Sequence, residues 1–109
     1  MNEIKFVQNI ENGWVVLKIS GRLDTTTAGQ GETEGMEGLA AGEKLALDVS
    51  ELEYISSAGL RVLLRIGKKA HAAGKDFYLV GATGMVKEVL EDSGLDVLFN
   101  IAENIKDLV

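Results

Sequence analysis

The stretch Asp48-Val-Ser-Glu-Leu-Glu-Tyr-Ile-Ser-Ser-Ala-Gly-Leu60 lies where the sequence predicts a strand followed by a helix. An apolar run precedes the motif and extends into it, over residues 45–49, and a helical pattern begins at Leu60. Small residues let backbone or a partner approach closely, and a serine at a helix start either caps the helix or is presented to another molecule. Which of these roles applies at Ser56 and Ser57 is the functional question.

The helix after this stretch is the clearest element of the chain. Over residues 58–73 apolar side chains recur at helical spacing, and Arg61, Arg65 and Lys68 line the opposite face. Gly74 fits the position just past a helix end. We therefore expect an amphipathic helix with a basic outer surface.

The first 19 residues predict a β-hairpin. Residues 3–10 have alternating character and predict an edge strand, and residues 14–19 are rich in β-branched and aromatic side chains. Asn12-Gly13 between them is a strong signal for a two-residue turn. We expect Ser20-Gly21 to end the second strand.

The next expected element is a helix whose sequence is unfavourable for helix formation. Asp24 is predicted to be its N-cap, with three threonines crowding the first turn. Four glycines fall within residues 29–38, and each costs a helix about 1 kcal/mol relative to alanine. We expect a helix that begins late or is frayed, ending at about Ala41.

Strands and helices then alternate to the end of the chain. The remaining predicted elements are strands at 45–49, 77–80 and 97–101 and helices at 85–90, ending near Gly94, and at 104–109. Right-handed crossovers between such strands favour a parallel sheet. The prediction is one α/β domain over residues 1–109, with an N-terminal hairpin, a mostly parallel mixed sheet of about five strands, and four helices.

Composition excludes several classes of function. The 109 residues contain no cysteine and one histidine, His71, so disulfide scaffolds, thiolate metal sites and His-rich clusters are excluded. The net charge of −6 argues against nucleic acid or an anionic membrane as partner. No signal peptide or membrane span is recognisable, so we expect a soluble cytoplasmic protein.

The charges are divided unevenly along the chain. Residues 24–53 carry eight acids against Lys44 alone, whereas residues 54–75 carry five lysines and arginines and no acid. The opening stretch lies at this border. A partner of complementary charge could use the border for orientation, although solvated surface charge explains it equally well.

An enzyme would need ingredients that the sequence does not supply, and we expect neither catalysis nor a cofactor. The paired carboxylates at 51 and 53, and at 91 and 92, are typical of solvated surface, and His71 is expected to face solvent or to pack. Residues 29–35 have the wrong spacing for a dinucleotide loop and carry acids that repel phosphate. Residues 81–84 could hold an anion, but an ordinary turn explains them better.

The run from Leu47 to Leu60 strongly resembles the signature of the STAS domain, and most of all that of bacterial anti-sigma factor antagonists. The resemblance extends to Gly21-Arg-Leu-Asp24, to Leu79-Val-Gly81 and to residues 86–99, so it covers nearly the whole chain. It implies a switch rather than a catalyst: the unphosphorylated protein binds an anti-sigma factor, a serine kinase of the histidine-kinase-like ATPase type, and releases the sigma factor. A PP2C-type phosphatase restores the active form.

By position the resemblance places the phosphoserine on Ser57, with Ser56 as the alternative because many members carry aspartate where this chain has Ser56. Asp24 matches a family acid at the same edge of the sheet, and helix capping explains it at least as well. The expected partner-binding residues are Asp24, Thr25, Ser56, Ser57, Ala58, Gly59, Arg61 and Arg65. We expect a monomer or weak dimer. The competing prediction is a STAS scaffold or sensor subunit without control of a sigma factor.

Overall fold

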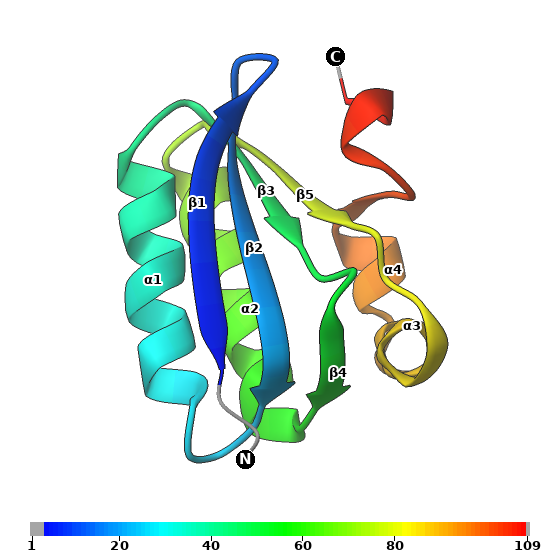
Figure 1. Ribbon diagram of the computed structural model, residues 1–109. Coiled ribbons are helices and arrows are strands. Elements are labelled where there is room, and N and C mark those ends of the chain that lie inside the picture. Colours follow the sequence, from blue (N-terminus) through cyan, green and yellow to red (C-terminus); the bar gives the residue numbers. More distant parts are fainter. Residues whose placement is uncertain (1–3, 109) are drawn as a thin grey trace.

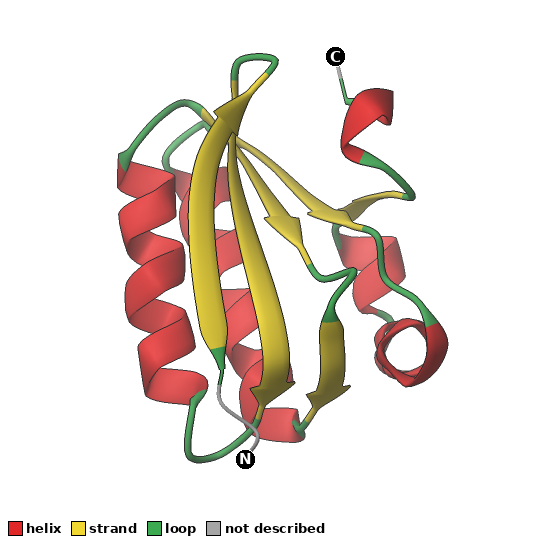
Figure 2. Ribbon diagram, viewed as in Figure 1, coloured by secondary structure: helices red, strands yellow, loops and turns green. Residues whose placement is uncertain are grey.

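The computed structural model describes residues 4–108 as a mixed sheet flanked by helices (Figures 1 and 2). Its strands are β1 (Lys5–Glu11), β2 (Trp14–Leu23), β3 (Lys44–Asp48), β4 (Leu52–Ile55), β5 (Asp76–Val80) and β6 (Asn100–Ala102). Its helices are α1 (Ala28–Ala40), α2 (Ser57–Ala72), α3 (Gly84–Ser93) and the short α4 (Leu95–Leu98), and a 3-10 turn covers Ile105–Asp107. The spatial order is β1-β2-β3-β5-β6, and β4 pairs with the far end of β2.

The N-terminal hairpin confirms the prediction made from Asn12-Gly13. Both residues have positive φ, 55° and 85°, as a two-residue turn of the I′ type requires. Glu11 opposes Trp14 across the turn, and β1 runs antiparallel to β2 as far as Lys5 opposite Ser20. All other strand pairs are parallel. The predicted start of the first strand at Glu3 lies outside the described residues.

The prediction that Ser20-Gly21 ends the second strand is wrong. Gly21, at φ 101°, forms an irregularity after which β2 leaves β3 and pairs with β4 through Leu23. Glycine tolerates this backbone conformation without strain. β4 was not predicted from the sequence, because its four residues are too few to show a clear period. The sheet therefore has six strands among the described residues rather than about five.

The glycine-rich helix α1 starts late, as expected, but it is continuous over 13 residues rather than frayed. Its buried face consists of Gly31, Gly35, Gly38 and Leu39. A β-carbon at Gly35 would overlap the side chain of Ile66 on α2, and one at Gly31 would lie 2.8 Å from Leu23 Cδ1. The glycines thus let α1 lie close against α2 and the sheet, and this packing compensates for their poor helix propensity.

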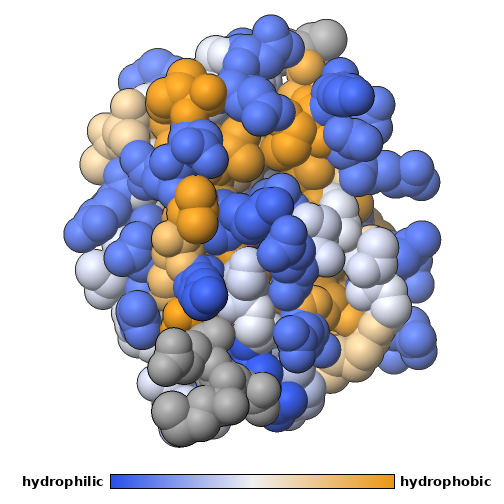
Figure 3. All heavy atoms as spheres, in the orientation of Figure 1, coloured by the Kyte–Doolittle hydropathy of each residue, from blue (hydrophilic) through white to orange (hydrophobic). Residues whose placement is uncertain are grey.

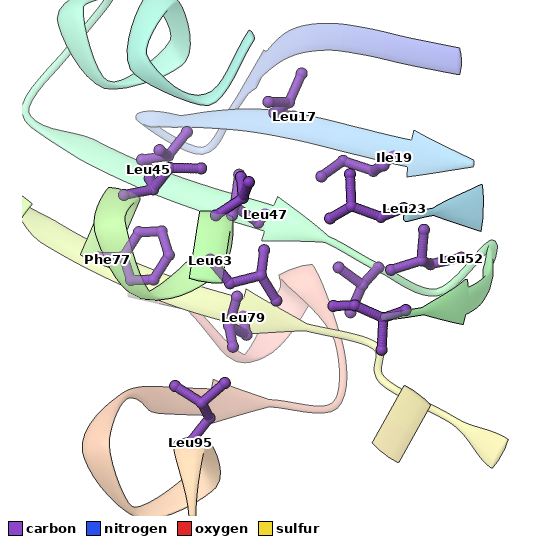
Figure 4. Close-up of a cluster of buried hydrophobic side chains, with 14 of the residues drawn as sticks. Leu17, Ile19, Leu23, Leu45, Leu47, Leu52, Leu63, Phe77, Leu79 and Leu95 are labelled. Carbon is purple, nitrogen blue, oxygen red and sulfur yellow. The ribbon is translucent and has the colours of Figure 1, made fainter. Parts of the chain in front are cut away.

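The main core lies between the sheet and the pair α1 and α2. Figure 4 shows leucines from β2, β3, β4 and β5 converging on Leu63 of α2. Leu17, Leu47, Leu63 and Leu79 are fully buried. The central strand β3 is covered on both faces: Leu45 and Leu47 belong to the main core, and Ala46 packs on the other side, so all three are inaccessible, as the apolar run predicted.

The opposite face of the sheet is covered in part by the C-terminal segment. Leu108 packs with Trp14, Val16, Ala46 and Val80, and Tyr78 meets Trp14 edge to face at 5.5 Å. Two predictions for this region are wrong in detail. The expected strand at 97–101 is the helical turn α4 followed by β6, because Gly94 adopts a left-handed conformation that starts a new turn. The expected helix at 104–109 is a single 3-10 turn, and Val109 lies outside the described residues.

Candidate functional site

The start of α2 is held against the end of β2. The Ser56 amide donates to the Leu23 carbonyl at 3.0 Å, which continues the pairing of Leu23 with Ile55 by one residue. Ser56 has an extended backbone, and its Oγ accepts a hydrogen bond from the Gly59 amide at 3.3 Å. Ser56 is therefore the N-cap of α2, the structural role that the sequence left open between two serines.

Ser57 is the first residue of the helix and has a different environment. Its side chain is exposed, whereas Ser56 is half-buried. Within residues 4–108 the structure shows no hydrogen bond from the Ser57 hydroxyl, so that group is available to solvent and to a partner. We refer to Ser56, Ser57, Ala58 and Gly59 as the tip.

The tip requires glycine at position 59, because the space around this residue has no room for a side chain. Gly59 is buried, and an added β-carbon would lie 2.6 Å from the Leu23 carbonyl oxygen and 2.8 Å from Ile55 Cγ1. The first of these atoms belongs to the backbone and cannot rotate away. Gly59 therefore supports the tip from beneath, while Ala58 and Ser57 reach its surface.

Asp24 lies at the neighbouring strand end, in the turn from β2 to α1. Its Oδ1 accepts hydrogen bonds from the Thr26 amide at 2.9 Å and the Thr26 hydroxyl at 2.7 Å. The prediction that Asp24 is the N-cap is wrong: α1 begins at Ala28, and its cap position is Thr27. The hydrogen bonds from Thr26 to the Asp24 side chain form a turn over these residues, and the helix begins only after it.

The hydrogen bonds in this turn also fix the charge of Asp24. The bond from the Thr26 hydroxyl, with smaller contributions from the backbone amides and from Arg22, lowers the pKa of Asp24 below its ordinary value of 3.8. Arg22 Nε lies 3.8 Å from Asp24 Oδ2. Asp24 therefore presents a carboxylate at neutral pH. Thr25, beside it, is exposed.

Two further residues at this edge were not among the site residues predicted from the sequence. Arg22 opposes Tyr54 across β2 and β4, and its guanidinium lies 4.1 Å from the centre of the Tyr54 ring. This cation–π contact bridges the strands just before the tip. The only sequence signal for β4 was the pattern of apolar and polar residues over Leu52–Ile55. Four residues are too few for such a pattern to identify a strand.

The acidic segment of the sequence contains α1 and the basic segment contains α2, and these two helices pack against each other. Arg65 of α2 donates to Glu32 of α1, with Nη1 and Oε1 2.8 Å apart. Arg65 therefore has a partner within the chain. Arg61 is exposed one helical turn after Ser57, so of the two arginines it is the one placed beside the tip.

The remaining candidates for chemistry are at the surface. Glu51 is paired with Lys18 at 3.0 Å and accepts from the Ser20 hydroxyl, and the hydrogen bond from Lys18 lowers the pKa of Glu51. His71 is exposed beside a cavity of about 480 Å³ near the far end of α2. Within residues 4–108 no cluster of three metal-ligating side chains occurs. Nor does any helix in this range have the length and apolarity needed to cross a bilayer.

The fold and the tip define a small α/β domain that presents a hydroxyl group at a helix start on the carboxyl edge of its sheet. The STAS domain model matches residues 3–108, and the chain therefore belongs to the STAS domain family. The family resemblance seen in the sequence is thus confirmed.

Known relatives share this architecture. BtrV of Bordetella bronchiseptica, which is described as an anti-sigma factor antagonist, is 31% identical over 102 residues, which is 93% of this chain and 88% of that protein. An anti-sigma factor antagonist from Mycobacterium paratuberculosis has a similar structure, with a TM-score of 0.88 at 24% identity over 96% of this chain and 90% of that chain. The phosphorylated form of the Bacillus cell fate determinant SpoIIAA gives 0.71 at 17% identity, over 94% of this chain and 95% of the other.

Proposed function

We propose that this protein is an anti-sigma factor antagonist whose binding to its partner is switched by phosphorylation of Ser57. In the unphosphorylated form it binds an anti-sigma factor that is also a serine kinase, and so releases the sigma factor. The relative BtrV supports the class of function, and the existence of a phosphorylated form of SpoIIAA supports the type of switch. A PP2C-type phosphatase would reverse the modification.

The proposal rests on the different environments of the two serines. Ser56 Oγ is engaged in capping α2, whereas the Ser57 hydroxyl is exposed at the first helical position. In the proposed step the Ser57 oxygen attacks the γ-phosphorus of ATP, ADP leaves, and the serine proton passes to a base of the kinase. The Ser56 oxygen already accepts the Gly59 amide hydrogen bond and is half-buried, so it is less accessible to a kinase than the Ser57 hydroxyl.

Phosphate at Ser57 would leave the fold intact and act on the interface. It adds a charge of about −2, which a helix N-terminus favours by up to about 1 kcal/mol. Buried against a partner without a matching cation, the same dianion costs several kcal/mol. A loss of about 4 kcal/mol weakens binding about a thousandfold, which is sufficient for a switch.

The test compares Ser57→Asp and Ser57→Ala in binding to serine kinases of the anti-sigma factor class from the source organism. We expect Ser57→Asp to lose binding about a thousandfold with an almost unchanged melting temperature, and Ser57→Ala to bind while taking up no phosphate. Titration calorimetry and thermal denaturation measure the two quantities. Unaltered binding by Ser57→Asp, or its unfolding, would contradict the proposal, and a wild-type protein that takes up no phosphate would favour the scaffold or sensor alternative.

A further inference from the structure

The strand β1 forms one edge of the sheet, and nothing in residues 4–108 covers it. In Figure 1 β1 is the strand nearest the viewer, and Figure 3 shows an interrupted line of hydrophobic spheres on the same side of the molecule. Val7 and Ile10 are 50% and 67% exposed. An open edge of seven residues with apolar side chains is a template for pairing with another strand.

The hairpin register determines which backbone groups of β1 are free. Glu11 and Trp14 close the two-residue turn and exchange hydrogen bonds, so the bonded positions on β1 are Glu11 and every second residue before it. The N–H and C=O groups of Phe6, Gln8 and Ile10 therefore point away from β2. Any added strand has to pair through these three residues.

The sequence of β1 is complementary to itself in a register that uses these groups. If two copies meet antiparallel with Gln8 opposite Gln8, Phe6 opposes Ile10, Lys5 opposes Glu11 and Val7 opposes Asn9, each twice; the first two of these pairs are complementary, and the third is not. In this register the hydrogen-bonded pairs are Gln8 with Gln8 and Phe6 with Ile10. Lys5 and Glu11 fall at the non-bonded positions, where side chains of opposing residues lie closest.

We propose that two copies of this chain associate through β1 in this register, forming a continuous sheet across a two-fold axis. Opposite charges and aromatic–aliphatic pairs across strands both favour the arrangement. The pairing uses the β1 edge of both copies, so it closes at a dimer. A single strand of seven residues is well below the roughly 20 residues per partner of stable interfaces, so the dimer is weak.

The dimer leaves both tips free. The tip lies at the end of the molecule opposite the hairpin turn, and an antiparallel copy has its tip at the other end of the assembly (Figure 1). Association through β1 and the proposed binding at Ser57 are therefore independent, and the failure of one says nothing against the other.

Charge reversal tests both the surface and the register. In Lys5→Glu two acids oppose each other at both ends of the interface, and in Glu11→Lys two lysines do, so each variant should dimerise at least about tenfold more weakly than wild type. An equimolar mixture of the two variants, and the double variant, restores both charge pairs and should recover association. Sedimentation equilibrium over a concentration series measures the constants, and circular dichroism checks that each variant is folded.

Gln8→Pro provides a backbone test, because it removes an outward N–H and leaves the bonds to β2 in place. We expect it to abolish the dimer while the melting temperature stays close to that of wild type. A wild type that remains monomeric to about millimolar concentration, the upper range for weak association, would overturn the proposal. The proposal would also be overturned if Lys5→Glu and Glu11→Lys each associated like wild type, or if their equimolar mixture did not recover association.

Discussion

Two helices begin side by side at the carboxyl edge of the sheet, and they use their polar residues differently. Before α1, Asp24 and Thr26 bond to each other, and the Thr27 hydroxyl donates to the Arg22 carbonyl at 2.8 Å. Before α2, Ser56 makes the cap and Ser57 makes no such bond among the described residues. The turn before α1 is built to stay fixed, whereas the start of α2 separates a structural serine from one that is free to react.

The largest effect on this comparison is expected from Gly59→Ala. The new methyl group would meet the Leu23 carbonyl and push α2 away from β2, at a cost of about 1–3 kcal/mol, typical of overpacked sites. The matched control is Gly31→Ala in α1, where the nearest atom is the movable end of the Leu23 side chain. Urea denaturation should show a clearly smaller loss for Gly31→Ala. Equal losses would mean that close backbone approach does not define the tip.

A smaller effect is expected from Ser56→Ala. Loss of the N-cap costs about 1 kcal/mol, whereas Ser57→Ala should leave the free energy of unfolding unchanged because its hydroxyl is exposed. The two variants should show the reverse order in phosphate uptake, with Ser56→Ala still modified. If Ser57→Ala were the less stable of the two, the assignment of the cap would be wrong.

The smallest effect concerns Asp24 and pH. Because hydrogen bonds lower its pKa in the folded state, the stabilisation by the carboxylate is fully present above the ordinary value of 3.8 and is lost as pH falls below it. Asp24→Asn should therefore be slightly less stable than wild type at pH 7, and the difference should vanish in acid. Denaturation of both proteins at several pH values provides the test. A difference that grows in acid would contradict this account.

Local patterns were sufficient to predict much of the fold. Asn12-Gly13 specified the hairpin turn, and the apolar stripe after Leu60 specified α2, because both signals depend on neighbouring residues. β4 could not be found in this way, because it is four residues long and exists through a distant partner, the part of β2 after Gly21. The continuity of α1 was also hidden, because the packing of Gly35 against Ile66 cannot be seen in a helix considered alone.

The candidate site was predictable in position but not in detail. The family resemblance indicated both serines, and no sequence rule decides which of two adjacent serines caps a helix. The extended backbone of Ser56, with ψ 176°, decides it in the structure. Arg22 and Tyr54 were missed for the same reason as β4, since their contact depends on strand pairing.

We propose that the partner kinase modifies Ser57 and not Ser56. The most direct measurement is mass spectrometric mapping of the phosphate after incubation of wild type, Ser56→Ala and Ser57→Ala with that kinase and ATP. The expected result is phosphate on Ser57 in wild type and in Ser56→Ala, and none in Ser57→Ala. Phosphate on Ser56 of the wild-type protein would contradict it.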